Sequence, residues 1–562
     1  MKMYHDSRNP VYRAPFGARK CMETVTLRCD APRADQVTLR LWVDSREIRV
    51  PMAPCGGGRF EADYTLPDVP GLVWYYFIGR FGEETLYCGN APDNLGGASW
   101  EYDFEPPSYQ ITVYDPAFET PEWLRHGIMY QIFPDRFCRG GDLRGWYREP
   151  KPYPETNTGK EKYDFFRGDL DGIVKKLDHL KALGVTILYL NPIFTAASVH
   201  RYDTGDYETV DERLGGNQAF DRLQRACHEK GIRLILDGVF SHTGADSRYF
   251  NKFGHYVDVG AYQSKKSPYA KWYKFKKWPD EYECWWGFQH LPDTEENDPG
   301  FRKYIRGIFR KWLDAGASGW RLDVADELPM DFIRLLRKTA HGAPLIGEVW
   351  EDASRKVAYG ELRCYCLGDT VDSVMNYPLW DALVDFLIGD RTAPQVAREL
   401  EALREVYPRT FFYALMNMTG SHDRPRILEI LSGRAPRRQP KEDRKPTALT
   451  DEERSRGRRA LMAMYRFMCA MPGVPCIYYG DEAGLAGADD PYNRRPYPWK
   501  SIDRELMDCM AHLNRERMDD AIWTEGDCRF GSDGDGKLTV TRELARRRVT
   551  VTLDRGAMDC FT

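Results

Sequence analysis

Apolar and polar residues alternate in short runs through the first part of the chain, up to about residue 115. The period of two is typical of strands that bury one face. Clusters of proline, glycine and aspartate separate the runs, which lie at 24–29, 36–43, 59–66 and 73–79. Short strands at this spacing predict a β-sandwich, and we assign it residues 1–115.

From about residue 125 the pattern changes to strands that alternate with helices. Strand-like runs lie at 128–133, 185–190, 233–239, 319–324, 345–349, 373–377, 411–416 and 476–479. Helical periodicity lies at 173–183, 219–230, 301–315, 331–340, 397–406, 457–470 and 504–515, and less clearly at 353–362 and 379–388. Eight such units predict a (β/α)₈ barrel over 116–515. A doubly wound sheet is the alternative, but no Gly-x-Gly-x-x-Gly loop supports it.

One connection is far longer than the usual handful of residues. It follows the third strand, is rich in aromatic residues and covers about 240–298. We predict that it forms a small loop domain over the barrel mouth. After residue 515 short strand-like runs return at 538–542 and 548–553, which predicts a small C-terminal β-module over 516–562.

The charge and apolar content exclude some classes of partner. The formal net charge of −5 gives no electrostatic reason to bind nucleic acid or an anionic membrane. No run approaches the ~20 apolar residues that a membrane span needs. The N-terminus lacks the apolar core of a signal peptide, and the 14 scattered cysteines are typical of reduced thiols, so we expect a cytoplasmic protein.

Candidate chemistry begins at the fourth strand of the predicted barrel. Arg321 and Asp323 alternate with apolar residues there and therefore share one face of the strand. A structural ion pair is the simplest interpretation, but such a pair is costly to bury. Two more carboxylates, Glu348 and Asp423, follow the fifth and seventh predicted strands. The C-terminal strand ends of a barrel meet at one mouth, so the three carboxylates should converge.

Paired carboxylates are what glycoside hydrolysis needs: one attacks or activates water, and the other protonates the leaving oxygen. Arg321 should keep Asp323 ionised, and the apolar residues around Glu348 should raise its pKa as an acid requires. Metal-assisted hydrolysis is the rival use of clustered Asp and His. No His-x-His or His-Glu-x-x-His spacing supports it.

At this point the motifs resemble a known family. The segments 237–242 (Asp-Gly-Val-Phe-Ser-His), 319–327, 347–350 (Gly-Glu-Val-Trp) and 420–423 (Gly-Ser-His-Asp) are similar, in order, to those of the α-amylase superfamily, glycoside hydrolase family 13. The resemblance is strongest to its neopullulanase, cyclomaltodextrinase and maltogenic amylase branch, and it covers nearly the whole chain. It implies a retaining hydrolase of α-1,4 and some α-1,6 bonds in maltodextrins, cyclodextrins or pullulan, with some transglycosylation.

The resemblance also implies a role for each matching residue. Asp323 corresponds to the nucleophile, Glu348 to the general acid/base and Asp423 to the carboxylate that stabilises the transition state. The matching substrate-binding positions are His200, Tyr202, Asp237, His242, Arg321, His422, Asp490 and Arg494.

The metal requirement, the assembly and the exact function are predicted less directly from the resemblance. Ser241 stands where many amylases have a calcium-binding asparagine, so we expect no metal or other cofactor to be required. The N-terminal module resembles one that binds starch or pairs two chains, which implies a homodimer, with a monomer as the alternative. An oligo-α-1,6-glucosidase and a catalytically silent sugar-binding relative are the other functions that this resemblance allows.

Overall fold

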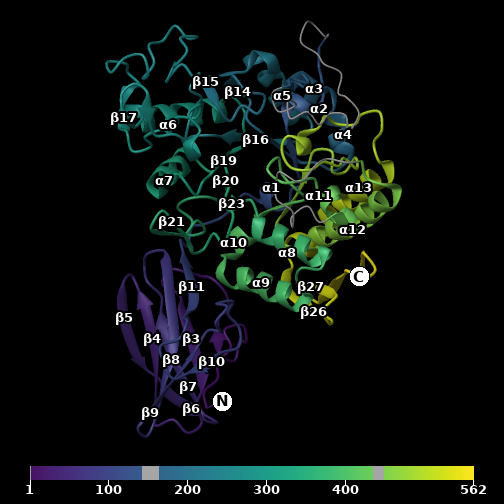
Figure 1. Cartoon of the computed structure of the whole chain (residues 1–562). Coiled ribbons are helices and arrows are strands. Elements are labelled where there is room, and N and C mark those ends of the chain that lie inside the picture. Colours follow the sequence, from purple (N-terminus) through teal and green to yellow (C-terminus); the bar gives the residue numbers. More distant parts are fainter. Residues whose placement is uncertain (1, 142–163, 435–447, 562) are drawn as a thin grey trace.

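The computed structural model describes residues 2–141, 164–434 and 448–561. Its N-terminal part is a β-sandwich that forms a lobe beside the barrel, and the barrel and a small terminal sheet make up the remainder (Figure 1). Within the described residues no helix is long and apolar enough to cross a membrane.

Two sheets form the N-terminal sandwich. The first has the order β1 (Arg13–Ala14), β3 (Thr24–Asp30), β7 (Arg59–Thr65) and β6 (Ala53–Gly56). The second contains β10 (Trp100–Tyr102), β9 (Glu84–Gly89), β8 (Gly71–Phe81), β11 (Tyr109–Tyr114) and β2 (Arg19–Lys20), and β4 (Gln36–Val43) joins β8 to β5 (Arg46–Pro51). Alternate residues such as Val25, Leu39 and Phe77 are fully buried between the sheets, as the period of two predicts.

Eight parallel strands form the barrel. In chain order they are β12 (Met129–Ile132), β13 (Ile187–Leu190), β16 (Arg233–Gly238), β19 (Gly319–Leu322), β20 (Leu345–Gly347), β23 (Ser373–Val374), β24 (Met416–Met418) and β25 (Val474–Tyr478). Each pairs with the next in the order β24-β25-β12-β13-β16-β19-β20-β23. Met375 pairs in parallel with Met416, which brings the two ends of the sheet together. The predicted (β/α)₈ barrel is therefore confirmed.

Helices alternate with these strands and cover the barrel. They are α3 (Leu170–Lys175), α4 (Leu177–Ala182), α5 (Gly216–Glu229), α6 (Pro299–Asp314), α7 (Met330–Thr339), α8 (Tyr377–Ile388), α9 (Ala393–Val406), α12 (Asp451–Ala470) and α13 (Arg504–Asp519). Local sequence fixes their ends. The Asp298 side chain accepts the N–H of Phe301 to begin α6, and Thr450 and Glu453 form a capping box at the start of α12.

Two predicted elements of the barrel are wrong. The strand expected at 411–416 begins only at Met416, because residues after Pro408 form the short helix α10 (Arg409–Phe412). The helix expected within 353–362 is a hairpin of β21 (Lys356–Ala358) and β22 (Glu361–Arg363). Its two turn residues, Tyr359 and Gly360, have φ values of 52° and 78°. Two consecutive positive φ values suit a tight hairpin turn and end any helix.

The long connection after β16 forms a loop domain over the mouth with its own aromatic core. Phe250 packs against Tyr273 and Tyr282, with ring centroids 4.9 and 4.8 Å apart. His242 and Asp293, at the two ends of the connection, form a bridge that fixes the loop domain to the barrel. The loop domain is thereby held close to the C-terminal ends of β16 and β19.

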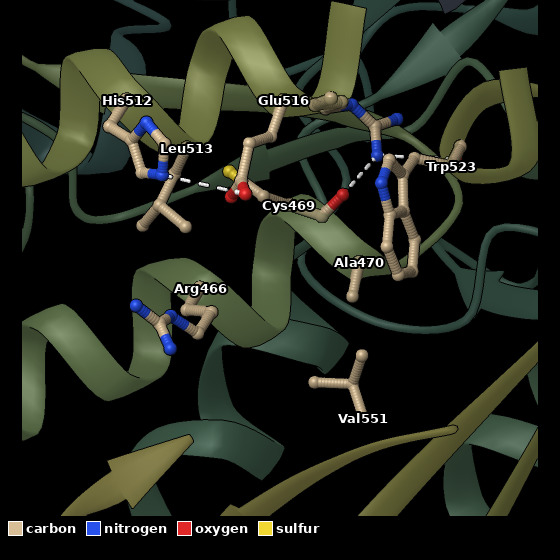
Figure 2. Close-up of a pocket in the computed structure, with 9 residues that line it drawn as sticks. Arg466, Cys469, Ala470, His512, Leu513, Glu516, Trp523 and Val551 are labelled. Carbon is tan, nitrogen blue, oxygen red and sulfur yellow. Dashed lines mark hydrogen bonds and ion pairs between the residues drawn. The ribbon is translucent and has the colours of Figure 1, made fainter. Parts of the chain in front are cut away.

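A four-stranded antiparallel sheet ends the chain. Its strands are β26 (Asp527–Ser532), β27 (Lys537–Leu544), β28 (Arg547–Asp554) and β29 (Asp559–Phe561), and it packs on α9 and α12. Buried Arg542 donates to the carbonyl of Ala470 at the end of α12. A cavity of about 160 Å³ lies at this junction. Figure 2 shows the side chains that line it, among them Val551 of β28 and His512 of α13. None of the predicted site residues lines this cavity.

Candidate active site

A single buried guanidinium binds three carboxylates at the barrel mouth. Nη1 of Arg321 lies 2.8 Å from Oδ1 of Asp237 and 2.7 Å from Oδ1 of Asp323. Nη2 lies 2.7 Å from Oε2 of Glu348. The Arg321 side chain has no exposed surface, so the two proposed catalytic carboxylates are held against a fixed positive charge.

Strand register brings these groups together. Asp237 of β16 is the direct partner of Arg321 on β19. The N–H of Glu348 donates to the carbonyl of Leu322, so Glu348 lies directly beyond the end of β20. Because the strands are parallel, residues just past their ends meet at the same rim.

Burial and the shared guanidinium act on the carboxylates in opposite directions. Burial raises the pKa of Asp323 well above its usual value and raises the pKa of Glu348, while Arg321 lowers both. The expectation that Arg321 keeps Asp323 ionised is therefore too simple, since the guanidinium serves three carboxylates at once. Burial thus raises the pKa of Glu348, as the sequence predicted for an acid, and it raises the pKa of Asp323 too, against the pull of Arg321 on both groups.

The residue after Asp323 is strained and holds Glu348. Val324 has a φ of 38°, in a region that a β-branched residue rarely adopts. Its N–H donates to Oε2 of Glu348 over 2.9 Å. Backbone strain of this kind collects at active sites, where the surrounding structure maintains it. The strained turn thus links the positions of Asp323 and Glu348 directly.

Asp423 lies across the site within a network of its own. Its Oδ2 is 3.0 Å from Nε2 of His422, and its Oδ1 is 3.4 Å from Nη2 of Arg494. Arg494 in turn pairs with Asp490 over 3.2 Å. Burial favours the neutral acid, but His422 and Arg494 outweigh it and hold the pKa of Asp423 well below its usual value. A carboxylate 31% exposed and ionised at neutral pH can accept sugar hydroxyls.

Tyr202 connects the carboxylates around Arg321 with the network around Asp423. Its ring stacks on His422, with centroids 5.1 Å apart and planes 9° apart, and its hydroxyl donates to Oδ2 of Asp237 over 2.9 Å. His200 stacks next to it with centroids 6.0 Å apart, and burial lowers the pKa of His200 to about 3. Asp237 has no exposed side-chain surface, so in this structure it supports Arg321 and Tyr202 from below.

His242 completes the predicted set. Its Nδ1 lies 3.0 Å from the hydroxyl of Ser241, and its Nε2 is buried and has no hydrogen-bond partner among the residues that the structure describes. Burial lowers its pKa to about 3, so the ring is neutral near pH 7. The ring lies 5.3 Å from that of Trp285 in the loop domain. An unpaired Nε2 beside His200 is suited to a sugar hydroxyl.

Sequence reasoning missed a supporting layer below these residues. Gln131 and Asn191 both donate side-chain N–H groups to Nδ1 of His422, each over 3.1 Å. With Nδ1 as acceptor, Nε2 carries the proton that faces Asp423. The Tyr189 hydroxyl donates to Oδ2 of Asp237 over 2.7 Å. Polar residues at or just past the ends of the first two strands are the signal in the sequence that indicates this layer.

Arg424, which follows Asp423, has a role that the sequence did not suggest. Its guanidinium lies 4.5 Å from the ring centre of Trp350 and 5.0 Å from that of Trp380. Trp350 stacks on Tyr377 with centroids 4.0 Å apart. Arg424 therefore joins the segment that follows Glu348 to the segment that carries Asp423.

Comparisons with known proteins show which proteins the chain is similar to. The chain is 38% identical over 592 aligned residues to an amylopullulanase of Thermoanaerobacterium thermosulfurigenes, covering 93% of this chain and 31% of that protein. The chain thus spans less than half the length of the amylopullulanases it matches.

Two solved structures are similar to the fold. One is a cyclic α-maltosyl-(1→6)-maltose hydrolase of Arthrobacter globiformis in complex with that sugar, with a TM-score of 0.66 and 29% identity over 77% of this chain and 91% of that one. The other is a cyclomaltodextrinase, with a TM-score of 0.67 and 27% identity over 98% and 90%.

The family is settled by a match that spans most of the barrel. The alpha amylase catalytic domain matches residues 131–527, which is more than half of the chain. That range contains Arg321 with its three carboxylates and Asp423 with its partners. It also contains the stacked rings of Tyr202 and His422. The chain belongs to the α-amylase family.

Proposed function

We propose that the protein is a retaining α-glucan hydrolase that cleaves α-1,4 and some α-1,6 bonds of maltodextrins, cyclodextrins or pullulan, with transglycosylation as a side reaction. The observation that carries the proposal is the placement of Asp323 and Glu348 on one guanidinium, opposite the ionised Asp423. A silent sugar-binding relative would not need all three carboxylates. The substrate classes rest on similarity to an amylopullulanase, a cyclomaltodextrinase and a hydrolase of a cyclic α-1,6-linked maltose dimer.

In the proposed reaction a glucosyl ring lies over Tyr202, and Asp423, His200, His242 and Arg494 bind its hydroxyls. The carboxylate of Asp323 attacks the anomeric carbon while protonated Glu348 gives its proton to the leaving oxygen. The C–O bond breaks and a glucosyl ester forms on Asp323. Ionised Glu348 then takes a proton from water, whose oxygen attacks the same carbon and releases Asp323. A sugar hydroxyl in place of water gives transglycosylation.

This mechanism predicts net retention of the anomeric configuration. Two displacements at one carbon restore the α configuration, and retaining enzymes have carboxyl groups about 5–5.5 Å apart. Proton NMR of the product released from maltotriose should show the α-anomer first. The β-anomer appearing first would exclude the double displacement, and no hydrolysis of maltotriose, β-cyclodextrin or pullulan would exclude the proposed function.

We further expect that activity does not depend on calcium. Ser241, in the position of the usual asparagine ligand, is 5% exposed, and its hydroxyl lies 3.0 Å from Nδ1 of His242. Calcium requires several hard oxygen ligands. Activity and melting temperature should be unchanged after EDTA treatment and dialysis. A fall in activity or melting temperature that added calcium reverses would show that the protein has a calcium site.

The assembly and location are also proposals. The N-terminal sandwich exposes Trp42, Trp100 and Phe104, whose exposed fractions are 39%, 55% and 61%. Exposed aromatic groups favour a protein interface, so we expect this sandwich to pair two chains. Light scattering at micromolar concentration should give twice the 65.1 kDa chain mass, and a single-chain mass would refute pairing. All 14 cysteines are free, which supports the reducing cytoplasm as the site of action.

A further inference from the structure

A fully buried amide lies in the loop that carries Asp490 and Arg494. Asn493 belongs to the 3₁₀ turn of Tyr492–Arg494 and is 0% exposed. The next residue, Arg494, directs its guanidinium to Asp423, with Nη2 3.4 Å from Oδ1. Asn493 is thus adjacent in the chain to a partner of Asp423, yet the proposed reaction gives it no role.

The side chain of Asn493 binds the backbone on both sides of Asp423. Its Nδ2 donates to the carbonyl of His422 over 2.6 Å and to the carbonyl of Arg424 over 2.9 Å. One amide nitrogen has two hydrogens and can make both bonds. Because Asp423 lies between His422 and Arg424, a single side chain holds its backbone at two points.

Asn493 is itself fixed to the end of β25. Its main-chain carbonyl accepts from Nε of Arg426 over 2.7 Å and from the Tyr478 hydroxyl over 3.3 Å. Arg426 pairs with Asp481 over 3.1 Å, and neither of these two side chains has any exposed surface. The buried end of β25 therefore fixes Asn493, and Asn493 fixes the backbone around Asp423.

The choice of an amide at this position has a cost. Oδ1 of Asn493 is buried and has no hydrogen-bond partner within the part of the chain that the structure describes. A buried acceptor without a partner lowers stability. A purely structural role would favour a residue without this cost, so the two donors are the feature that the position requires. An amide supplies them without adding a charge beside Asp423.

Resting on the proposed function, we propose that Asn493 is a positioning residue for Asp423. It acts through the backbone of His422 and Arg424 and so sets where the Asp423 carboxylate lies. In that position the carboxylate is 3.0 Å from Nε2 of His422 and 3.4 Å from Nη2 of Arg494. Asp423 can then meet the sugar ring without first reorganising, which is what efficient transition-state stabilisation needs.

Removing the two donors should slow turnover more than it weakens substrate binding. Asn493→Ala should lower kcat on maltotriose about 100-fold, because a misplacement of ~1 Å at a reacting group has an effect of this order. KM should change less than about threefold, since Asp423 contributes most as charge develops on the sugar. Asn493→Leu has a similar shape without the donors and should behave in the same way.

A double-mutant cycle shows whether Asn493 acts through Asp423. In the Asp423→Ala protein the carboxylate is gone, so adding Asn493→Ala should lower kcat less than about twofold further. The substrate is an α-maltoside of an acidic phenol, whose good leaving group keeps the remaining rate measurable. If the losses of the two single variants multiply in the double variant, Asn493 does not act through Asp423.

Asn514→Ala is the matched control. Asn514 on α13 is also 0% exposed, and its Nδ2 donates to the carbonyl of Leu183 over 2.7 Å. Its truncation removes a buried amide from a carbonyl away from the barrel mouth. The melting temperature should fall about as much as in Asn493→Ala, while kcat should stay within about twofold of the unaltered protein.

Unchanged kcat in both Asn493 variants, or an equal fall of kcat in Asn514→Ala, would overturn the proposal. If the unaltered protein hydrolyses neither maltotriose nor the maltoside, the proposed function fails, and a crystal structure of Asn493→Leu tests the role of Asn493 separately. A carboxylate of Asp423 that has moved away from His422 and Arg494 supports that role. A carboxylate that still lies 3.0 and 3.4 Å from them rejects it.

Discussion

Replacing Asp323 with asparagine should remove nearly all turnover of maltotriose while the fold stays intact. Asparagine is close to aspartate in size but cannot form the glucosyl ester, so the first displacement is lost. Its amide can still accept from Arg321 through the side-chain oxygen, which lies 2.7 Å from Nη1 in the aspartate. Single-turnover kinetics should show no product burst, and the circular dichroism spectrum should match that of the unaltered protein.

Glu348→Gln is the companion variant. It keeps a hydrogen-bond acceptor for Val324 N–H but has no proton for the leaving oxygen. Loss of a general acid usually costs ~10²–10⁴-fold. A substrate whose leaving group needs no protonation, such as an aryl glucoside with an acidic phenol, should lose much less with this variant. If Asp323→Asn retains more than about a tenth of the activity, Asp323 is not the nucleophile.

The eight-strand architecture was predictable because barrel strands are buried on both faces and read as apolar runs. The two wrongly predicted elements lie where local sequence preference and tertiary packing favour different structures. Residues 411–416 are apolar and aromatic and read as a strand, yet Phe411 and Phe412 bury their rings from a helical turn. The hairpin at 356–363 depends on two positive φ values, one of them at Tyr359, which no residue preference indicates.

The meeting of Asp323 and Glu348 at the barrel mouth was also predictable, because charged residues at the ends of apolar strands stand out. What sequence could not show is how one charge is shared. Arg321 was expected to serve Asp323, whereas it also holds Asp237 and Glu348. Supporting groups such as Gln131, in β12, and Asn191, directly after β13, carry no charge and so do not stand out in the sequence. Their roles follow only from the meeting of β12, β13 and the segment that carries His422.

Replacing Glu405 with alanine should produce the largest loss of stability. This residue of α9 anchors the N-terminal sandwich, since its Oε1 lies 3.0 Å from Nη1 of Arg13 and its Oε2 lies 3.0 Å from Nε of Arg8. The Arg13 and Glu405 side chains are 0% and 3% exposed. Removing one partner of a buried pair leaves the other charge desolvated, which costs about 3–5 kcal/mol in free energy of unfolding.

The loss should be confined to the sandwich and its contact with α9. In urea, Glu405→Ala should separate an early transition of the sandwich from a later one of the barrel, because the anchor between them is gone. Glu399→Ala, on the same helix, removes the partner of Arg391 at a site where both side chains are about one-third exposed. Exposed pairs contribute about 0–1 kcal/mol, so this control should shift the midpoint little. Equal shifts for the two variants would mean that Glu405 stabilises α9 alone and does not anchor the sandwich.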